Sequence, residues 1–361
     1  MHDGSVSKVT DGERSPGSRF AAAAAACCLV AGACLVLVSS RSTLWDRDEA
    51  VYSQEAAEMR SSGGYLVPTL GGEPWMEKPP LVLWLMALSL GLPIPVETAL
   101  RLPSIAAFAA AGWFTFRLGS ALRSPRDGLV ACAILLLSPL ALLSGAAATM
   151  DAVLLASTTA SLSILASAPP HAPRRRDVLA LGLALALGQL AKGPPGLVLP
   201  LLAAAPAALL GPPAGRRGFV RLVAPAAGVS LLAYLAWAVP ANVATSGLLL
   251  SDGFGVNILG RILSPMEAHG GWGAIGLLFY PALLVLAFSP WTLFLVDGFR
   301  EIGGPRSSRA AAILAGGIGV PLLLFTAVAT KLPSYVLPAF PALAVVAAAG
   351  VFAPRSSRWQ G

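Results

Sequence analysis

The chain has 361 residues, of which 56% are hydrophobic and only 12% are charged, with a formal net charge of +7. A soluble domain carries roughly 25% charged residues because water must wet its surface, so this composition excludes an ordinary soluble enzyme. The positive charge does not predict nucleic-acid binding, because the basic residues lie in short loops between apolar runs and form no continuous basic face. The four cysteines lie inside apolar runs, with neither a disulfide framework nor metal-ligand spacing.

The apolar runs predict an all-α polytopic membrane protein. A spanning helix needs about 20 apolar residues. Ten segments approach that length: 20–40, 100–122, 127–145, 151–168, 178–191, 194–211, 219–241, 273–297, 310–329 and 333–352. The first is interpreted as a retained span and not as a cleaved signal peptide, because the chain after it is itself mostly apolar. The predicted domains are a disordered N-terminus at 1–19, a transmembrane domain at 20–352 and a short basic tail at 353–361.

Charge placement predicts the orientation of these spans. The short run Leu81–Leu92 is bracketed by prolines, and a run of that length is more often interfacial than spanning. If it lies on the membrane, 17 of the 25 Lys and Arg residues fall in loops on one side. The positive-inside rule then predicts a protein of the cytoplasmic (inner) membrane with both termini in the cytoplasm. The outer face carries two long loops, 41–99 and 242–272, and 11 of the 18 acidic residues, so we expect the chemistry there.

The first outer loop holds two recognisable pieces. Residues Glu49–Arg60 have an apolar stripe at helical spacing, which predicts an amphipathic helix lying in the membrane interface. Further on, Pro79 and Pro80 fix the backbone directly after Glu77 and Lys78. The loop therefore holds an acid and a base beside the bilayer surface.

Six motifs in chain order carry a resemblance to a known family. They are Arg47-Asp48-Glu49-Ala50-x-Tyr52, Glu77-Lys78-Pro79-Pro80-Leu81, Ala99-x-Arg101-Leu102-Pro103-Ser104, Ala148-Thr149-Met150-Asp151, Leu190–Gly196 and Lys331–Pro338. Together they resemble the bacterial aminoarabinose transferase and protein O-mannosyltransferase relatives within the GT-C glycosyltransferases, over about residues 20–352. The resemblance implies a GT-C-like bundle that moves a sugar from a polyprenyl-phosphate donor to an acceptor hydroxyl on a lipid, glycan or protein, with inversion.

Such a reaction needs a general base for the acceptor hydroxyl, which contributes typically 10²–10⁴-fold to the rate. Asp48 matches the catalytic aspartate of the family and is the expected base. The alternative is that Asp48 is the N-cap of the helix that follows. Glu49 is expected to be a supporting acid or a partner of the helix dipole.

Cations on the outer face are the expected ligands of the donor phosphate. Lys78 matches the family's motif and suits a phosphate as a compact point charge, although it could instead snorkel to lipid headgroups. Arg261 is the only arginine of the second long loop and could clamp the phosphate by two hydrogen bonds. Lys331 and Tyr335 flank Pro333 and could hold the same phosphate, or serve as a topological anchor and an aromatic-belt residue.

Two further groups of residues are expected near the site. The resemblance implies that Glu77 and a histidine of the later outer loop, here His269, lie near a divalent metal ion, although His269 could be an exposed loop residue. Asp151 begins a span, where an ionisable group is a functional hypothesis by default. We expect Asp151 to be a supporting acid, or to cap its helix or pair with Lys192 or Arg101 in an ion-pair network.

The chain departs from the family pattern at three places. Val51 stands where an arginine is frequent, and Trp75 where a tyrosine is common. The sequence stops at Gly361, so we expect no C-terminal acceptor-recognition module.

Two other classes of protein are alternatives to the enzyme interpretation. They are a transporter or flippase of lipid-linked sugars and a non-catalytic membrane subunit. Transporters tend to show internal repeats and charges at the membrane midplane, whereas this chain has no convincing repeat and keeps its ionisable residues at span ends and in loops.

Overall fold

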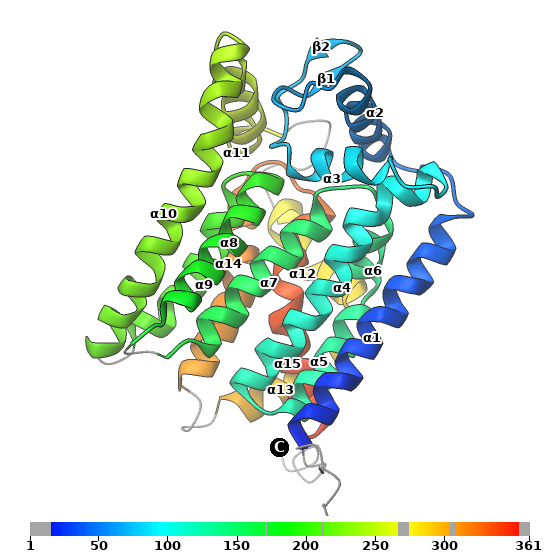
Figure 1. Ribbon diagram of the computed structural model, residues 1–361. Helices are drawn as coiled ribbons and strands as arrows, with labels where there is room; N and C mark the ends of the chain where they lie inside the picture. Colours follow the sequence, from blue (N-terminus) through cyan, green and yellow to red (C-terminus); the bar gives the residue numbers. More distant parts are fainter. Residues whose placement is uncertain (1–15, 170–171, 211–212, 266–273, 304–307, 354–361) are drawn as a thin grey trace, which may run out of the picture.

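The computed structural model describes residues 16–169, 172–210, 213–265, 274–303 and 308–353. Over these residues the chain is a bundle of helices with one small two-stranded ladder at one end (Figure 1). The predicted all-α membrane architecture is confirmed. The predicted N-terminal disorder and the metal candidate His269 lie largely or wholly outside the described residues.

The first half of the chain forms the following elements: α1 (Pro16–Ser39), α2 (Arg47–Ser62), β1 (Thr69–Leu70), β2 (Glu73–Pro74), α3 (Leu81–Ser89), α4 (Val96–Leu122), α5 (Pro125–Leu136), α6 (Pro139–Ala146) and α7 (Asp151–Ser167). The second half forms α8 (Arg175–Lys192), α9 (Pro195–Leu209), α10 (Pro213–Ala244), η1 (Leu249–Gly260), α11 (Arg261–Leu263), α12 (Ala274–Ala287), η2 (Trp291–Phe294), α13 (Leu295–Ile302), α14 (Ser308–Ala327), η3 (Pro333–Ala339) and α15 (Phe340–Val351).

Each of the ten predicted spans coincides with a helix or with consecutive helices. Within the described residues, five helices are long and apolar enough to cross a membrane, or up to seven if each of two bent pairs counts as one span. One pair bends by 64° between α5 and α6. The other bends by 99° between α12 and the segment Trp291–Ile302, which comprises η2 and α13. Prolines stand at both breaks, Pro139 and Pro290, and a proline lacks the N–H that would continue the helical ladder. The count of ten spans stays a prediction.

The segment predicted as the first outer loop folds as two helices joined by a hairpin. The predicted helix at 49–60 is α2, which ends at Gly63 in the left-handed conformation (φ 72°), where glycine has no steric penalty. The run Leu81–Leu92 forms the short helix α3. Figure 1 shows α2, α3, the hairpin and α11 at one end of the bundle, whereas α1 begins at the other end.

A two-residue turn and one carboxylate fix the hairpin. Gly71 and Gly72 both have positive φ angles of 65° and 84°, as a type I′ turn between β1 and β2 requires. The carboxylate of Glu58 on α2 accepts hydrogen bonds from Thr69 Oγ1 at 2.8 Å and from the N–H groups of Gly71 at 2.8 Å and Gly72 at 3.1 Å. These bonds, with one from Gln54, lower the pKa of Glu58 to about 2. The hairpin therefore holds the start of the Trp75–Lys78 segment against α2.

The helix α15 is the centre of the bundle. Its residues from Phe340 to Gly350 are all buried. Glycines permit its closest crossing, since a Cβ at Gly298 would lie 2.0 Å from the carbonyl oxygen of Val346, and one at Gly350 would lie 2.0 Å from that of Phe294. A cavity lies at the end of the bundle that carries α2.

Candidate active site

A cavity of about 810 Å³ opens at this end of the bundle. Its walls come from α2, the segment after the hairpin, the starts of α7 and α9, the end of α8, α10, η1, α11, the end of α14 and η3. Seven of the residues predicted from sequence line it: Asp48, Glu77, Lys78, Asp151, Lys192, Arg261 and Tyr335. The structure therefore brings together side chains that are up to 287 positions apart in the sequence.

Asp48 lies in the first turn of α2 and is exposed on the cavity wall. The N-cap of α2 is Asp46, whose side chain makes no capping hydrogen bond. The alternative interpretation of Asp48 as the helix cap is therefore wrong, because the helix begins two residues earlier than expected, at Arg47. Asp48 is one of the residues that line the cavity.

Glu49 has the opposite surroundings, although it is the next residue. It is 0% exposed and forms a two-pronged ion pair with Arg101, from Nε to Oε1 at 2.9 Å and from Nη2 to Oε2 at 3.0 Å. Its carboxylate also accepts the N–H groups of Ala148 at 2.7 Å and Trp45 at 3.0 Å. Burial acts to raise the pKa of Glu49, but these donors outweigh it and hold the pKa below its ordinary value.

Arg101 completes this buried cluster from the first turns of α4. Its guanidinium also donates to Ser42 Oγ at 2.7 Å, to the Ser42 carbonyl oxygen at 3.1 Å and to the Thr43 carbonyl oxygen at 2.7 Å. The cluster ties the exit of α1, the start of α2, the start of α4 and the segment before α7 to one another. We call it the anchor network: Ser42, Thr43, Glu49, Arg101 and Ala148.

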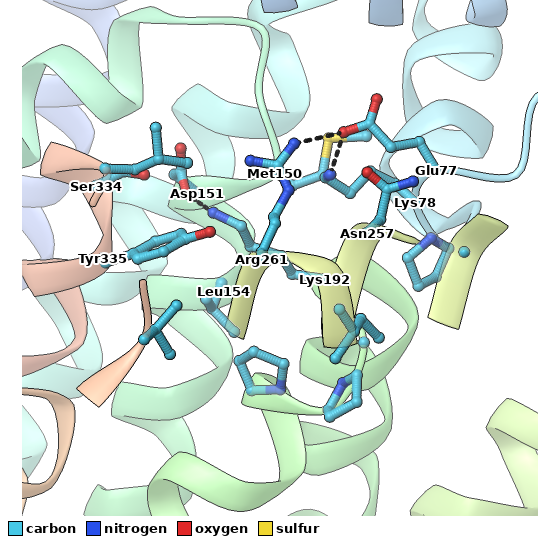
Figure 2. A pocket seen from close by; sticks show the side chains of 18 of the residues that line it. Glu77, Lys78, Met150, Asp151, Leu154, Lys192, Asn257, Arg261, Ser334 and Tyr335 are labelled. Atoms are coloured by element: carbon cyan, nitrogen blue, oxygen red, sulfur yellow. Dashed lines mark hydrogen bonds and ion pairs between the residues drawn. The ribbon is translucent and has the colours of Figure 1, made fainter. Parts of the chain in front are cut away.

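A second charged group lies on the cavity wall itself. Figure 2 shows Lys78 and Arg261 both directed at Glu77, with Lys78 Nζ 2.5 Å and Arg261 Nη2 3.4 Å from Glu77 Oε1. Burial acts to raise the pKa of Glu77, but Lys78 and Arg261 outweigh it and keep this pKa below its ordinary value. Burial also lowers the pKa of Lys78, and Glu77 offsets only part of this effect. Lys78 and Arg261, two cations from distant segments of the chain, thus both form ion pairs with the carboxylate of Glu77.

Asp151 forms an ion pair with Lys192, which is one of its two predicted partners. The other predicted partner, Arg101, pairs with Glu49 instead. The Lys192 ammonium also lies 5.5 Å from the centre of the Tyr335 ring (Figure 2). Asp151 is the first residue of α7, whose N-cap is Met150. The pair therefore joins the start of α7 to the end of α8 beside η3.

Lys331 does not line the cavity. Its ammonium donates to carbonyl oxygens near the end of α14, those of Phe325 at 3.1 Å, Thr326 at 2.6 Å and Val328. The last carbonyl groups of a helix have no partner within it and attract a cation. The structure thus places the predicted phosphate ligand Lys331 at a helix terminus.

Glu55 is a buried acid that sequence reasoning did not single out. It lies on α2, is 2% exposed, and its Oε1 has no hydrogen-bond partner within the described residues. Burial, followed by the negative charge of Glu77, raises the pKa of Glu55 to about 8. Its apolar neighbours on α2, Tyr52, Ala56 and Met59, explain why the helix spacing predicted a core stripe but not this acid.

The predicted metal ion has one ligand candidate among the described residues. Oε1 of Glu77 already accepts Lys78 and Arg261, and His269 is outside the described part. Over the residues that the structure describes, no group of three His, Cys, Asp or Glu side chains could hold a metal ion. A metal site at Glu77 therefore stays a prediction.

Comparisons with known proteins point to one family. The family profile of dolichyl-phosphate-mannose-protein mannosyltransferases matches residues 77–241. The undecaprenyl phosphate-alpha-4-amino-4-deoxy-L-arabinose arabinosyl transferase of Edwardsiella ictaluri is 29% identical over 315 residues, covering 84% of this chain and 55% of the relative. The transferase of the same name from Pseudomonas aeruginosa (strain UCBPP-PA14) is 29% identical over 312 residues, with the same coverage. The chain thus spans about half the length of these relatives.

Solved structures agree with the sequence relatives. ArnT from Cupriavidus metallidurans, bound to undecaprenyl phosphate, aligns with a TM-score of 0.77 at 21% identity, over 92% of this chain and 59% of that one. The apo oligosaccharyltransferase of Archaeoglobus fulgidus aligns with a TM-score of 0.62 at 13% identity, over 93% and 50%. The resemblance to the aminoarabinose transferases of the GT-C group is confirmed. The fold is that of the GT-C transferases.

Several polar residues that line this GT-C cavity were not singled out from sequence. Arg47 precedes Asp48 in the Arg-Asp-Glu motif, and this position in the motif could have identified it as a site residue. Asn257 lies four positions before Arg261, and Ser334 directly precedes Tyr335. Ser334 belongs to the Lys331–Pro338 motif, which could have identified it, whereas Asn257 carries no charge and lies in none of the six motifs.

Proposed function

We propose that the protein is a membrane glycosyltransferase that moves a sugar from a polyprenyl-phosphate donor to an acceptor hydroxyl. The observation that carries this proposal is the shared cavity, in which the Asp48 carboxylate and the cations Lys78 and Arg261 face one volume. The reaction requires one base and several cations beside the lipid headgroups. The GT-C fold and the similarity to transferases named for undecaprenyl phosphate support the same reaction class.

Asp48 acts as the general base. It takes the proton of the acceptor hydroxyl while the hydroxyl oxygen attacks the anomeric carbon of the sugar. The bond from that carbon to the phosphate oxygen breaks on the opposite face, and the phosphate leaves with the electron pair. The configuration at the anomeric carbon is inverted as a result.

Lys78 and Arg261 bind the phosphate of the donor. Their common partner in the structure is Glu77, and an incoming phosphate shares these two cations with that carboxylate. Developing negative charge on the leaving phosphate is stabilised where water is scarce, so the charges act more strongly than in bulk solvent. Tyr335 donates a hydrogen bond from its hydroxyl to the donor phosphate. The ion pair of Lys192 and Asp151 stabilises the cavity wall beside Tyr335.

The inner wall of the cavity suits an isoprenoid chain. Apolar side chains of α7, α9, α11 and α14 line it: Leu154, Val198, Leu199, Ile262, Leu324 and Phe325. A polyprenyl tail is wholly apolar, so it gains free energy by leaving the charged mouth for this wall. The tail therefore lies below the phosphate, toward the interior of the bundle.

The cavity faces the outer side of the inner membrane, and both termini lie in the cytoplasm. Loops with most of the lysines and arginines support this orientation, since such loops remain in the cytoplasm. The common location of α2, the hairpin and α11 at one end of the bundle agrees with it. In this orientation α2 lies at the headgroup level.

The direct test uses membranes that contain the full chain and a panel of radiolabelled polyprenyl-phosphate sugars. We expect label to pass from at least one donor to a hydroxyl-bearing acceptor, and the Lys78→Gln/Arg261→Gln variant to raise the donor KM. A matched control is Arg216→Gln/Arg217→Gln, which removes two cations outside the cavity lining. Movement of intact donor across the membrane without transfer would contradict the proposal.

A further inference from the structure

A second hollow lies along the side of the bundle, away from the candidate active site. It has a volume of about 1380 Å³ and lies between α4 and α8, which both pack on α7. Figure 1 shows these three helices side by side, with α7 in the middle. We call this hollow the α7 groove.

Small side chains hollow the α7 groove. The residues on its walls in the middle of the three helices are Ala106, Ala107, Ala110, Ala156, Ala160 and Ala184. Leucines of α3 line the end nearest the active site, among them Leu81, Leu85 and Leu88. The groove is thus a continuous apolar surface that α3 covers at one end.

Positive charge marks the other end. Arg117 near the end of α4 and Arg174 and Arg176 at the start of α8 line the groove. The only acid in the lining is Asp177, which lies 3.8 Å from the Arg176 Nε and accepts the backbone N–H of Arg174 at 3.0 Å. Three arginines against one aspartate leave a net positive mouth.

The length of the groove suits a lipid tail. Its wall on α4 runs from Leu102 to Arg117, which is about 22 Å at 1.5 Å per residue. One leaflet of a bilayer has a hydrocarbon depth of about 15 Å, half of the core. An acyl chain whose headgroup lies at the arginines therefore fits entirely between α4 and α8.

We propose that the α7 groove binds an anionic phospholipid, with its phosphate at Arg117, Arg174 and Arg176 and an acyl chain along α7. Charge complementarity selects this occupant, because a zwitterionic lipid brings no net charge to the arginine mouth, and basic pockets between membrane helices hold anionic headgroups. This site is independent of the transferase reaction, since it shares no lining residue with the candidate cavity.

Native mass spectrometry of the full chain in detergent tests the proposal. The protein is titrated with phosphatidylglycerol or with phosphatidylcholine of the same acyl chains. One variant, Arg117→Gln/Arg174→Gln/Arg176→Gln, removes the charged mouth. Its matched control, Arg216→Gln/Arg217→Gln/Arg221→Gln, removes three charges near the start of α10 that do not line the groove.

We expect the wild type to bind phosphatidylglycerol more tightly than phosphatidylcholine. The groove variant should lose this affinity by about tenfold or more, and the control variant should stay near wild type. Ala110→Phe, which fills the groove, should weaken binding, whereas Ala236→Phe on an exposed part of α10 should not.

Three outcomes would overturn the proposal. They are equal affinity for the two phospholipids, equal losses in the groove and control variants, and unchanged binding by Ala110→Phe. Tighter binding of a polyprenyl phosphate than of phosphatidylglycerol at the same arginines would also overturn it, because the occupant would then be a different lipid.

Discussion

Two neighbouring carboxylates at the start of α2 lie in opposite surroundings. Glu49 is fully buried and satisfied by a guanidinium and two backbone N–H groups, whereas Asp48 is exposed on the wall of the cavity. A carboxylate that is surrounded by donors is poorly suited to take a proton, while an exposed one can meet a substrate hydroxyl. The comparison separates two roles: the buried anchor network joins the ends of several helices, whereas the cavity presents a carboxylate to the chemistry that we propose.

The largest expected effect is on the anchor network. Arg101→Met removes the cation and leaves Glu49 buried without its partner, which costs about 3–5 kcal/mol of stability. The unfolding temperature of the purified protein in one detergent measures this loss.

Two companion variants sharpen the result. Arg176→Met breaks an ion pair in which the arginine side chain is 73% exposed, and should change stability by no more than about 1 kcal/mol. Glu49→Gln/Arg101→Met should recover part of the loss, because no unpaired charge remains. An unchanged unfolding temperature in Arg101→Met would show that the network does not hold the fold.

The next effect is on donor binding at the cavity. Lys78→Gln removes the charged contact that we propose with the donor phosphate, so we expect the donor KM to rise by about tenfold. Lys331→Gln is the matched variant, because Lys331 binds the end of α14 and does not line the cavity. It should lower the unfolding temperature more than donor affinity. A larger loss of donor affinity than of unfolding temperature would indicate that Lys331 binds the phosphate, as the sequence predicted.

A third effect is a pH dependence on α2. Glu55 has its pKa raised to about 8, so its contribution to stability is full below the ordinary pKa of a glutamate and is lost as pH rises toward 8. Glu55→Gln, which resembles the protonated acid, should therefore leave stability unchanged at pH 4 and raise it at pH 9. Unfolding temperatures at these two pH values measure the difference.

Glu58→Gln is the control for this pH effect. The pKa of Glu58 is about 2, so this acid stays ionised over the same range, and its substitution should lower stability about equally at both pH values. A Glu55→Gln variant with the same shift at pH 4 and pH 9 would show that Glu55 is not protonated in the fold.

Periodic patterns predicted the helices well, and local contacts explain what they missed. The apolar runs located each predicted helical segment, and the glycines after α2 marked its end. The apolar runs also placed α7, α8 and α9 within three residues of their bounds, although these helices have only 17, 18 and 15 residues. Buried membrane helices can be shorter than about 20 residues because neighbouring helices, and not lipid, cover their ends. The number of spans therefore depends on packing.

Residues from several of these motifs line one cavity, but the motifs did not determine the pairing of charges. Arg101 and Lys192 were both candidates for Asp151, and only the packing of α4 against the exit of α1 gives Arg101 to Glu49. Lys331 belongs to a family motif, yet the carbonyl groups at the end of α14 attract its ammonium. Sequence identifies which groups are charged, whereas the three-dimensional fold decides which partner lies closest.

The measurement that tests the central claim most directly is single-turnover sugar transfer by Asp48→Asn, with donor binding measured on the same protein. Asp46→Asn is the matched control, because it removes a neighbouring carboxylate that also lines the cavity. We predict that Asp48→Asn binds the polyprenyl-phosphate donor as the wild type does but transfers its sugar about 10²-fold more slowly or worse, while Asp46→Asn retains most of its rate. Equal transfer rates in Asp48→Asn and the wild type would contradict the assignment of Asp48 as the base.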